Sequence, residues 1–318
     1  MPMAPFRPVP QNIISPLTQA AVFLTLTLEE GGEKTCREAL AGIAALRNSV
    51  GRRRDTDPDS LSCVAGVGSD AWDRLFPGPR PTALHPFTEL RGPVHKAPST
   101  PGDLLLHLRA DRMDLCFELA DEVLARLRPH AKTVDETHGF GYFDSRDLLG
   151  FVDGTENPAG EAAATWAYAD PEQEPDFPGG SYAIVQKYLH DRDSWNALAV
   201  EEQERAVGRT KTDDIELPDD AKPADSHVAL NVITDADGNE LKIVRRNMPF
   251  FNHARGEYGT YFIGYAASPE ITEQMLRNMF LGTDDAPHDR LLDFSTAVTG
   301  GLFFIPPESF LADQPPIP

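Results

Sequence analysis

Short segments in which apolar residues alternate with polar ones, or run together, recur along the first half of the chain and predict β-strands. Between them lie segments whose apolar residues return every three or four positions, which is typical of helices that bury one face. The predicted elements are, in order, a strand at 20–28, a helix at 34–48, a strand at 61–67, a short helix from Ser69, a loop at 77–101, a strand at 104–110, a helix at 111–128 and a strand at 131–143.

The second half shows a similar but looser pattern. Alternating apolar residues predict a strand in HVALNVIT (227–234), and the Asp237-Gly238 turn predicts that this strand forms a hairpin with ELKIVRRN (240–247). The segment 144–181, rich in Asp, Gly and Pro, is expected to connect the two halves. The other predicted elements are a strand at 182–189, a helix at 193–208, a strand at 259–266, a helix at 269–280 and a strand at 301–306.

The order of these elements indicates the fold class. The first half follows β-α-β with a second β-α-β, which is typical of the ferredoxin-like unit, and the second half resembles it more loosely. We therefore predict an α+β fold made of duplicated ferredoxin-like units with antiparallel sheets. The predicted domains are residues 6–143 and residues 144–312.

Composition limits the classes of partner and the cellular compartment that we expect for this protein. The net charge of -21 and the pI near 4.7 argue against binding to nucleic acid or to an anionic membrane surface. Three widely spaced cysteines, Cys36, Cys63 and Cys116, predict neither a disulfide framework nor a thiolate metal site. The first twelve residues lack the charged and apolar regions of a secretory signal. We therefore expect a cytoplasmic protein.

The first candidate for chemistry is Asp153, in the stretch LGFVDGTENP (149–158). Asp-Gly and Asn-Pro are common turn dipeptides, so the simplest interpretation is a surface loop. However, apolar residues precede the acid, and glycines lie on both sides of it. A carboxylate held by such a backbone can closely approach a flat ligand, because glycine adds no side chain.

The second candidate is Arg245-Arg246-Asn247, at the end of a predicted strand. Side chains two positions apart share a face of a strand, so Arg245 and Asn247 should point one way and Arg246 the other. A charged strand end exposed to solvent would give the same sequence. An arginine and an asparagine beside a carboxylate would instead form a compact polar pocket.

The third candidate is His227. A single histidine at a strand start is more often a surface or core residue than a metal ligand, and eight other histidines compete with it. None of the nine forms the H-E-x-x-H pattern of a zinc helix. Spacing alone does not select His227.

Taken together, GFVDGTENP (150–158), the later His227 and IVRRNMPF (243–250) resemble the dye-decolourising peroxidases, and most closely their compact B-type bacterial branch. The resemblance extends through nearly the whole chain. It implies two ferredoxin-like halves, with one non-covalent haem b per chain in the C-terminal half. The implied enzyme is an oxidoreductase that reduces hydrogen peroxide through a ferryl intermediate and oxidises dyes, phenols or similar one-electron donors.

The resemblance also implies residue roles. His227 would be the proximal ligand of the haem iron, Asp153 the distal acid–base residue, and Arg245 its cationic partner, with Asn247 completing the distal pocket. An acidic residue should lie behind His227, and HDRLLDF (288–294) offers Asp289 or Asp293, of which we favour Asp289. The remaining residues that should contact the haem are Gly154, Thr155 and Arg209.

Two other hypotheses compete with a peroxidase. The same motif would serve a haem-handling protein that releases iron from haem or stores the cofactor, with incidental peroxidase activity. A non-enzymatic ferredoxin-like module would bind no haem. The resemblance further implies a homo-oligomer, while the absence of a long C-terminal extension argues against packaging in an encapsulin shell.

Overall fold

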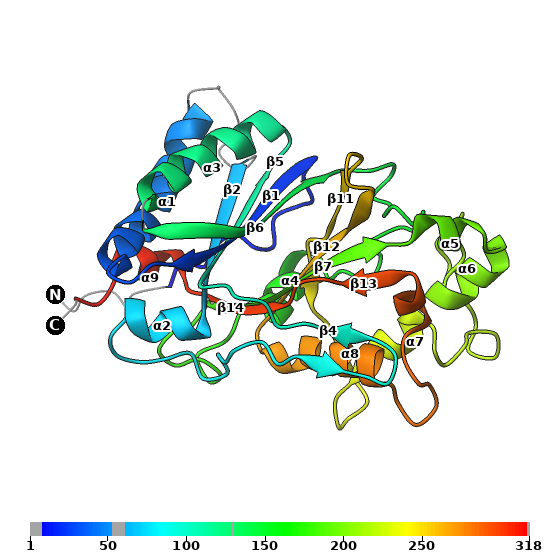
Figure 1. Ribbon diagram of the computed structural model, residues 1–318. Coiled ribbons are helices and arrows are strands. Elements are labelled where there is room, and N and C mark those ends of the chain that lie inside the picture. Colours follow the sequence, from blue (N-terminus) through cyan, green and yellow to red (C-terminus); the bar gives the residue numbers. More distant parts are fainter. Residues whose placement is uncertain (1–7, 53–60, 129, 317–318) are drawn as a thin grey trace.

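The computed structural model describes residues 8–52, 61–128 and 130–316, and Figure 1 shows the arrangement of its elements. The elements of the first half are β1 (Ala20–Leu28), α1 (Glu33–Arg52), β2 (Leu61–Gly68), α2 (Ser69–Leu75), β3 (Leu90–Arg91), β4 (Lys96–Ala97), β5 (Leu104–Ala110), α3 (Met113–Leu127) and β6 (Ala131–Phe140).

The second half begins with a loop and a short helix before its first strand. Its elements are α4 (Gly160–Ala167), β7 (Ser181–His190), α5 (Arg192–Asn196), α6 (Val200–Val207), α7 (His227–Asn231), β8 (Ile233–Thr234), β9 (Glu240–Leu241), β10 (Val244–Arg245), β11 (Met248–Asn252), β12 (Glu257–Ala266), α8 (Pro269–Leu281), the 3-10 helix η2 (Arg290–Asp293), β13 (Ser295–Ala297), β14 (Gly301–Ile305) and α9 (Glu308–Ala312).

Ten strands from the two halves form one antiparallel sheet, whereas β3–β4 and β8–β9 are two separate hairpins. In the first half the order is β2-β5-β1-β6, and in the second half β10-β12-β7-β14, with β11 beside β12 and β13 beside β7. Each half therefore has the element order and antiparallel pairing of a ferredoxin-like unit. The two units join where Phe303 and Phe304 of β14 lie opposite Gly68 and Val67 of β2. The predicted fold class is confirmed.

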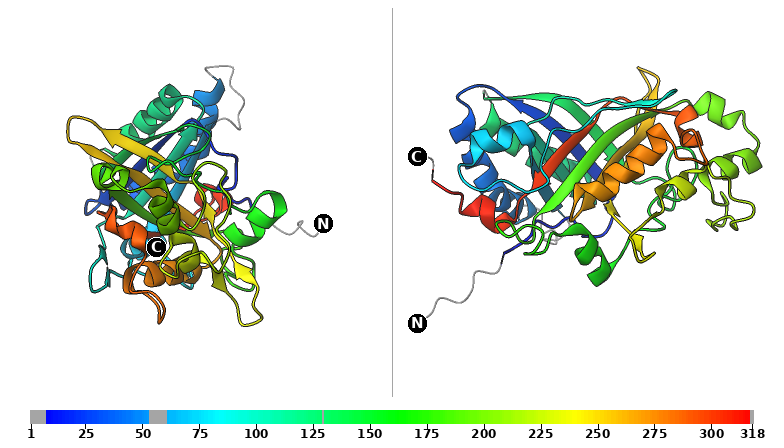
Figure 2. Two further views of the ribbon diagram at one scale, coloured as in Figure 1. Left: turned by 90° about the vertical axis from the view of Figure 1, so that its right-hand side faces the viewer. Right: turned by 90° about the horizontal axis from the view of Figure 1, so that it is seen from below.

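Alternation along the strands separates two cores. In β1, Val22 and Leu24 pack with the helix-covered core, whereas Ala21 and Phe23 pack with Ile263 of β12 in a second core. Figure 1 shows α1 and α3 side by side over the first half, and Figure 2 shows the twist of the long sheet. Burying each such large side chain contributes roughly 1.5–3 kcal/mol. Successive residues of β1 are therefore buried on opposite faces of the sheet, one set in each core.

The structure corrects the prediction for residues 227–234. His227–Asn231 is the short helix α7, and only Ile233–Thr234 is a strand. This strand pairs with Glu240–Leu241, so the hairpin has two residues in each strand. The side chain of Ser226 caps the helix by accepting a hydrogen bond from the N–H of Ala229 at 3.4 Å. Over five residues, alternation and helical periodicity are not distinguishable, which is why the pattern was misleading.

Other differences are smaller. The helix predicted at 193–208 is divided into α5 and α6, while α4 and the β3–β4 hairpin occur in segments predicted as loops. Strand β11, which contains Pro249, was not among the predicted elements. It pairs only with β12, where a proline is tolerated at the edge of the sheet.

No helix in the described part of the chain is both long and apolar enough to cross a bilayer. The division into domains at residues 143 and 144 stays a prediction, and residues 6 and 7 of the first predicted domain lie outside the described residues.

Candidate active site

A cavity lies between α8 and the face of β7 and β12 that carries Tyr188, Thr260 and Phe262. Alternation explains this placement, because the intervening Tyr261 and Ile263 point into the second core. The apolar part of the cavity wall comes from α8 and five further segments. It includes Leu149, Phe151, Val207, Val228, Leu241, Ile243, Met275, Leu276, Met279, Leu291 and Leu292.

Two histidines line this cavity, and their hydrogen bonds distinguish them. The His190 ring is engaged at both nitrogens, Nδ1 with the Ser295 hydroxyl at 2.8 Å and Nε2 with the Thr260 hydroxyl at 2.9 Å. Burial and the charge of Arg192 lower the His190 pKa to about 4, which keeps the ring neutral. His227 uses Nδ1 alone among the described residues, so its Nε2 is available to a ligand. No pattern in the sequence distinguishes His190 from the other histidines.

The Nδ1 atom of His227 lies 2.6 Å from Oδ2 of Asp289, whose side chain is fully buried. The other oxygen of Asp289 accepts the N–H of Leu291 at 2.9 Å. Asp293, the alternative left open by the sequence, instead contacts His95 and His288. A carboxylate that accepts Nδ1–H fixes the tautomer in which Nε2 carries the free lone pair.

Two close contacts hold α7 in position. Gly208 ends α6 with a positive φ of 94°, and a Cβ there would lie 3.0 Å from both the Ser226 hydroxyl and the Val228 Cβ. Glycine therefore allows the end of α6 to meet the start of α7, which carries His227. The amide of Asn278 in α8 donates to the Leu230 carbonyl at 2.9 Å.

Asp153 belongs to a loop that its own backbone closes tightly. Its N–H donates to the Ser145 carbonyl at 2.8 Å, and Arg146 forms an isolated β-bridge with Val152. Gly150 and Gly154 have positive φ angles of 94° and 86°, so both flanking glycines are needed for the turn geometry. Asp153, Gly154 and Thr155 all line the cavity.

Arg245 and Asn247 also line the cavity, whereas Arg246 donates to the carbonyls of Ile14 and Ser15 on the other side of the strand. The predicted alternation of these three side chains is therefore observed. The Nδ2 atom of Asn247 donates to Asp153 at 3.3 Å, while its Oδ1 accepts the N–H of Ile263 at 3.0 Å. Because the backbone donor fixes Oδ1, the amino group of Asn247 must face the carboxylate.

The guanidinium of Arg245 forms no ion pair with Asp153 in the described part of the chain, and its buried Nε has no hydrogen-bond partner there. The Arg245 backbone is held instead by Asn157, whose amide donates to its carbonyl at 2.9 Å and accepts its N–H at 2.8 Å. Sequence reasoning missed this role of Asn157, although the residue stands in the recognised motif.

Asp147 is a further acid in the cavity wall that was not anticipated from the sequence. Its Oδ1 accepts the N–H groups of Leu149 and Phe151, each at 3.0 Å. Burial raises the pKa of Asp147 to about 6, and the nearby charge of Asp153 adds to this rise against the lowering effect of the backbone bonds. The local sequence offers only the Asx-turn spacing as a signal.

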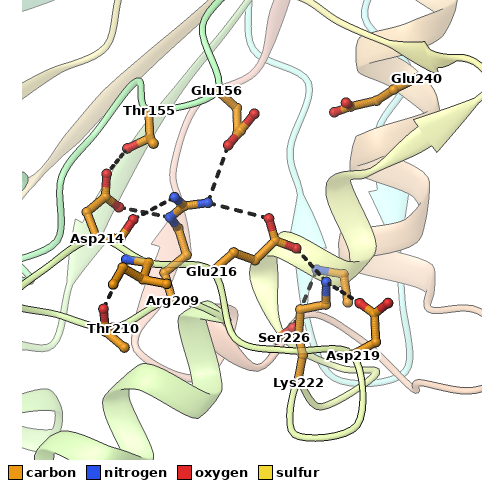
Figure 3. Close-up of polar contacts among 12 residues, drawn as sticks. Thr155, Glu156, Arg209, Thr210, Asp214, Glu216, Asp219, Lys222, Ser226 and Glu240 are labelled. Carbon is orange, nitrogen blue, oxygen red and sulfur yellow. Dashed lines mark hydrogen bonds and ion pairs between the residues drawn. The ribbon is translucent and has the colours of Figure 1, made fainter.

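Arg209 reaches the cavity rim inside a shell of carboxylates (Figure 3). Its Nε donates to Asp214 at 2.8 Å, whereas its Nη1 lies at the longer distances of 3.4 Å from Glu156 and 3.6 Å from Glu216. Thr155 also donates to Asp214, so the two predicted contacts share one carboxylate partner.

A second hollow meets the first at the polar residues just described. Asp153, Gly154, Arg245 and Asn247 line both. Its other walls come from residues 17–19, 140–146 and 248–249, several of which are exposed. The polar group is thus reached from solvent on a side separate from His227.

Comparison with known proteins matches both halves of the chain to one family. Residues 10–141 match the model "Dyp-type peroxidase, N-terminal", and residues 144–310 match "Dyp-type peroxidase, C-terminal". A dye-decolorizing peroxidase of Mycolicibacterium paratuberculosis is 61% identical over 310 residues, which cover 97% of this chain and 86% of the relative.

Solved structures agree. The encapsulated DyP-type peroxidase of Mycobacterium smegmatis superposes with a TM-score of 0.95 at 59% identity, covering 98% of this chain and 100% of that one. A DypB variant of Rhodococcus jostii RHA1 in complex with heme gives 0.93 at 53% identity, covering 96% and 98%. Deferrochelatase of Escherichia coli K12 is only 24% identical, over 79% of this chain and 66% of its own length.

Proposed function

The chain belongs to the Dyp-type peroxidase family and is a haem peroxidase, and from this premise we propose that His227 binds the haem iron while Asp153 and Arg245 act on hydrogen peroxide. The convergence of these side chains on one cavity carries the proposal. Electrons would come from dyes, phenols or similar one-electron donors. The distant deferrochelatase match does not favour iron release over peroxidase activity.

The residues of the cavity fit a haem. Its walls are largely apolar, as the porphyrin faces require, and His227 presents a free Nε2 backed by a buried carboxylate. The orphaned Nε of Arg245 indicates that a polar partner belongs in the cavity beside it. When bound, the haem would supply the two electrons that reduce peroxide and would regain them one at a time from reducing donors.

Proton movement is the task we assign to Asp153. Its carboxylate would take the proton from one peroxide oxygen and deliver it to the oxygen that departs as water. The hydrogen bond from Asn247 orients the carboxylate for this transfer. Arg245 would stabilise negative charge on the departing oxygen, and Asn157 holds the Arg245 backbone in place.

We assign Gly154, Thr155 and Arg209 to the haem periphery. A propionate at Arg209 would replace the contacts with Glu156 or Glu216, since these are the longest of its ion pairs. Asp289 would hold His227 in the ligating tautomer. The second hollow offers a route by which peroxide reaches Asp153 without passing His227.

The test compares the two cavity histidines. His227→Ala should abolish the absorption spectrum of histidine-ligated haem, because no other described cavity imidazole has a free nitrogen. His190→Ala is the matched control and should retain that spectrum. An unchanged spectrum in His227→Ala, or its loss only in His190→Ala, would remove His227 from the ligand role.

Three wider expectations remain proposals. The free cysteines Cys36, Cys63 and Cys116, all buried, support a cytoplasmic protein. The homo-oligomer is proposed from the family alone. The encapsulated state belongs to the Mycobacterium smegmatis protein, and our expectation that this chain is not packaged in that way stays a prediction.

A further inference from the structure

Outside the cavity, three potential metal ligands meet on the surface. The Nε2 atoms of His95 and His288 each lie 2.9 Å from Oδ1 of Asp293. One potential ligand atom from each of the three side chains lies within 4.8 Å of the other two. No other group of three or more histidine, cysteine or acidic side chains in the described part of the chain is this close. The two imidazole rings are 4.6 Å apart and inclined by 70°, so they converge on the carboxylate without stacking.

The proposed peroxidase function leaves this cluster without a task. Asp289, four residues before Asp293, is fully buried against His227, whereas the Asp293 side chain is 43% exposed and faces the other way. His95 comes from the turn between β3 and β4, nearly two hundred residues away in the sequence. The contact of His288 with Asp293 is the only hydrogen bond of the His288 ring among the described residues, since its Nδ1 is buried without a partner.

We propose that His95, His288 and Asp293 bind a divalent transition-metal ion of the zinc class. Two imidazoles and one carboxylate are ligands that zinc prefers, and the partial exposure of the cluster leaves room for water as the fourth ligand. Tetrahedral bonds of about 2.0–2.1 Å place neighbouring ligand atoms about 3.3 Å apart. The nitrogen-to-oxygen distances of 2.9 Å would have to widen by only a few tenths of an ångström.

An ion here would join two segments that together support the proximal side of the cavity. The turn carrying His95 closes with the Gly92 N–H donating to the His95 carbonyl at 2.9 Å. It packs on the end of α8, where a Cβ on Gly92 would lie 1.8 Å from the Phe280 carbonyl oxygen. His288 directly precedes Asp289, whose N–H donates to the Met279 carbonyl of α8 at 2.9 Å. The metal would therefore clamp the segment that positions Asp289.

Zinc binding to the holoenzyme tests the proposal by a readout that does not depend on turnover. Isothermal titration of the holoenzyme with zinc chloride, in metal-free buffer, should show one tight zinc site per chain. We expect His95→Ala and Asp293→Asn to weaken that site at least tenfold, because each removes a ligand from a different element. A fixed concentration of zinc that saturates the unsubstituted protein should raise its melting temperature more than that of either variant.

The matched control is His85→Ala, which removes another exposed histidine, paired with Glu273 at 3.1 Å. Zinc affinity should be unchanged in this variant. Zinc held by the carboxylates around Arg209 would also persist in His95→Ala, so a tight site that survives both His95→Ala and Asp293→Asn overturns the proposal. The absence of tight zinc binding in the unsubstituted holoenzyme overturns it as well.

Discussion

Replacing Asp289 with Asn tests the proximal side of the site with a change of almost no volume. The carboxylate now accepts two N–H groups, from His227 at one oxygen and from Leu291 at the other. An asparagine has one acceptor and one donor on these positions. Whichever way the amide is turned, its NH₂ group must face a donor.

The structure shows which of the two donor–donor contacts can be relieved. The Leu291 N–H is a backbone donor and cannot be moved to another atom, whereas the His227 ring can shift its proton from Nδ1 to Nε2. That tautomer removes the lone pair that would bind iron. A hydrogen bond to a charged group contributes about 1.5–3 kcal/mol, and loss of such a partner typically weakens metal binding 10- to 100-fold. The two estimates agree, because tenfold corresponds to about 1.4 kcal/mol.

Haem affinity is measured by transfer of haem from the protein to an excess of a haem-binding competitor, and the iron reduction potential by spectroelectrochemistry. We expect Asp289→Asn to lose haem 10- to 100-fold more readily and to have a higher potential, because a less anionic ligand stabilises the oxidised iron less. Asp293→Asn in zinc-free buffer is the control, since its carboxylate does not contact His227. Wild-type affinity and potential in Asp289→Asn would refute the reasoning.

Three further predictions concern the distal side. Arg245→Leu should slow the reaction with peroxide on the order of 10²-fold, measured by stopped-flow absorbance, and a wild-type rate would exclude charge stabilisation by this residue. Asp153→His should move the pH optimum for a neutral phenol upward at both low and high salt; a shift that disappears in high salt would instead reflect the net charge of -21. The pKa of Asp147, raised by burial to about 6 from 3.8, means that the folded state binds the proton more tightly than the unfolded state. The ionisation of Asp147 therefore lowers the free energy of unfolding as pH rises from about 4 to about 6. The decrease is at most about 3 kcal/mol, since water screens part of the interaction. In Asp147→Asn that loss should be absent. Denaturant unfolding at pH 4 and pH 7 should therefore show the variant becoming more stable relative to wild type at the higher pH. The same difference in unfolding free energy at both pH values would contradict the assignment.

The sequence by itself determined the order of most of the longer elements, because these strands and helices display their own periodicity, although α4 was missed. It also determined the tight loop at Asp153, since the flanking glycines specify backbone angles that other residues rarely adopt. The opposite directions of Arg245 and Arg246 were predicted from strand geometry, although β10 ends at Arg245 and the next two residues lie between β10 and β11. These features are local, so they can be predicted from neighbouring residues.

Only the tertiary structure decided the remaining features of the site. Helix α7 spans five residues, too few for a pattern, and it forms because Ser226 caps it and α6 and α8 pack around it. The choice between Asp289 and Asp293 depends on how one turn of 3-10 helix is oriented against a residue 62 positions away. His190 has no free ring nitrogen because Ser295 and Thr260, from two other strands, form hydrogen bonds with both. Each of these outcomes is a contact between distant segments, and the energy of such a contact is not encoded in the spacing of residues along the chain.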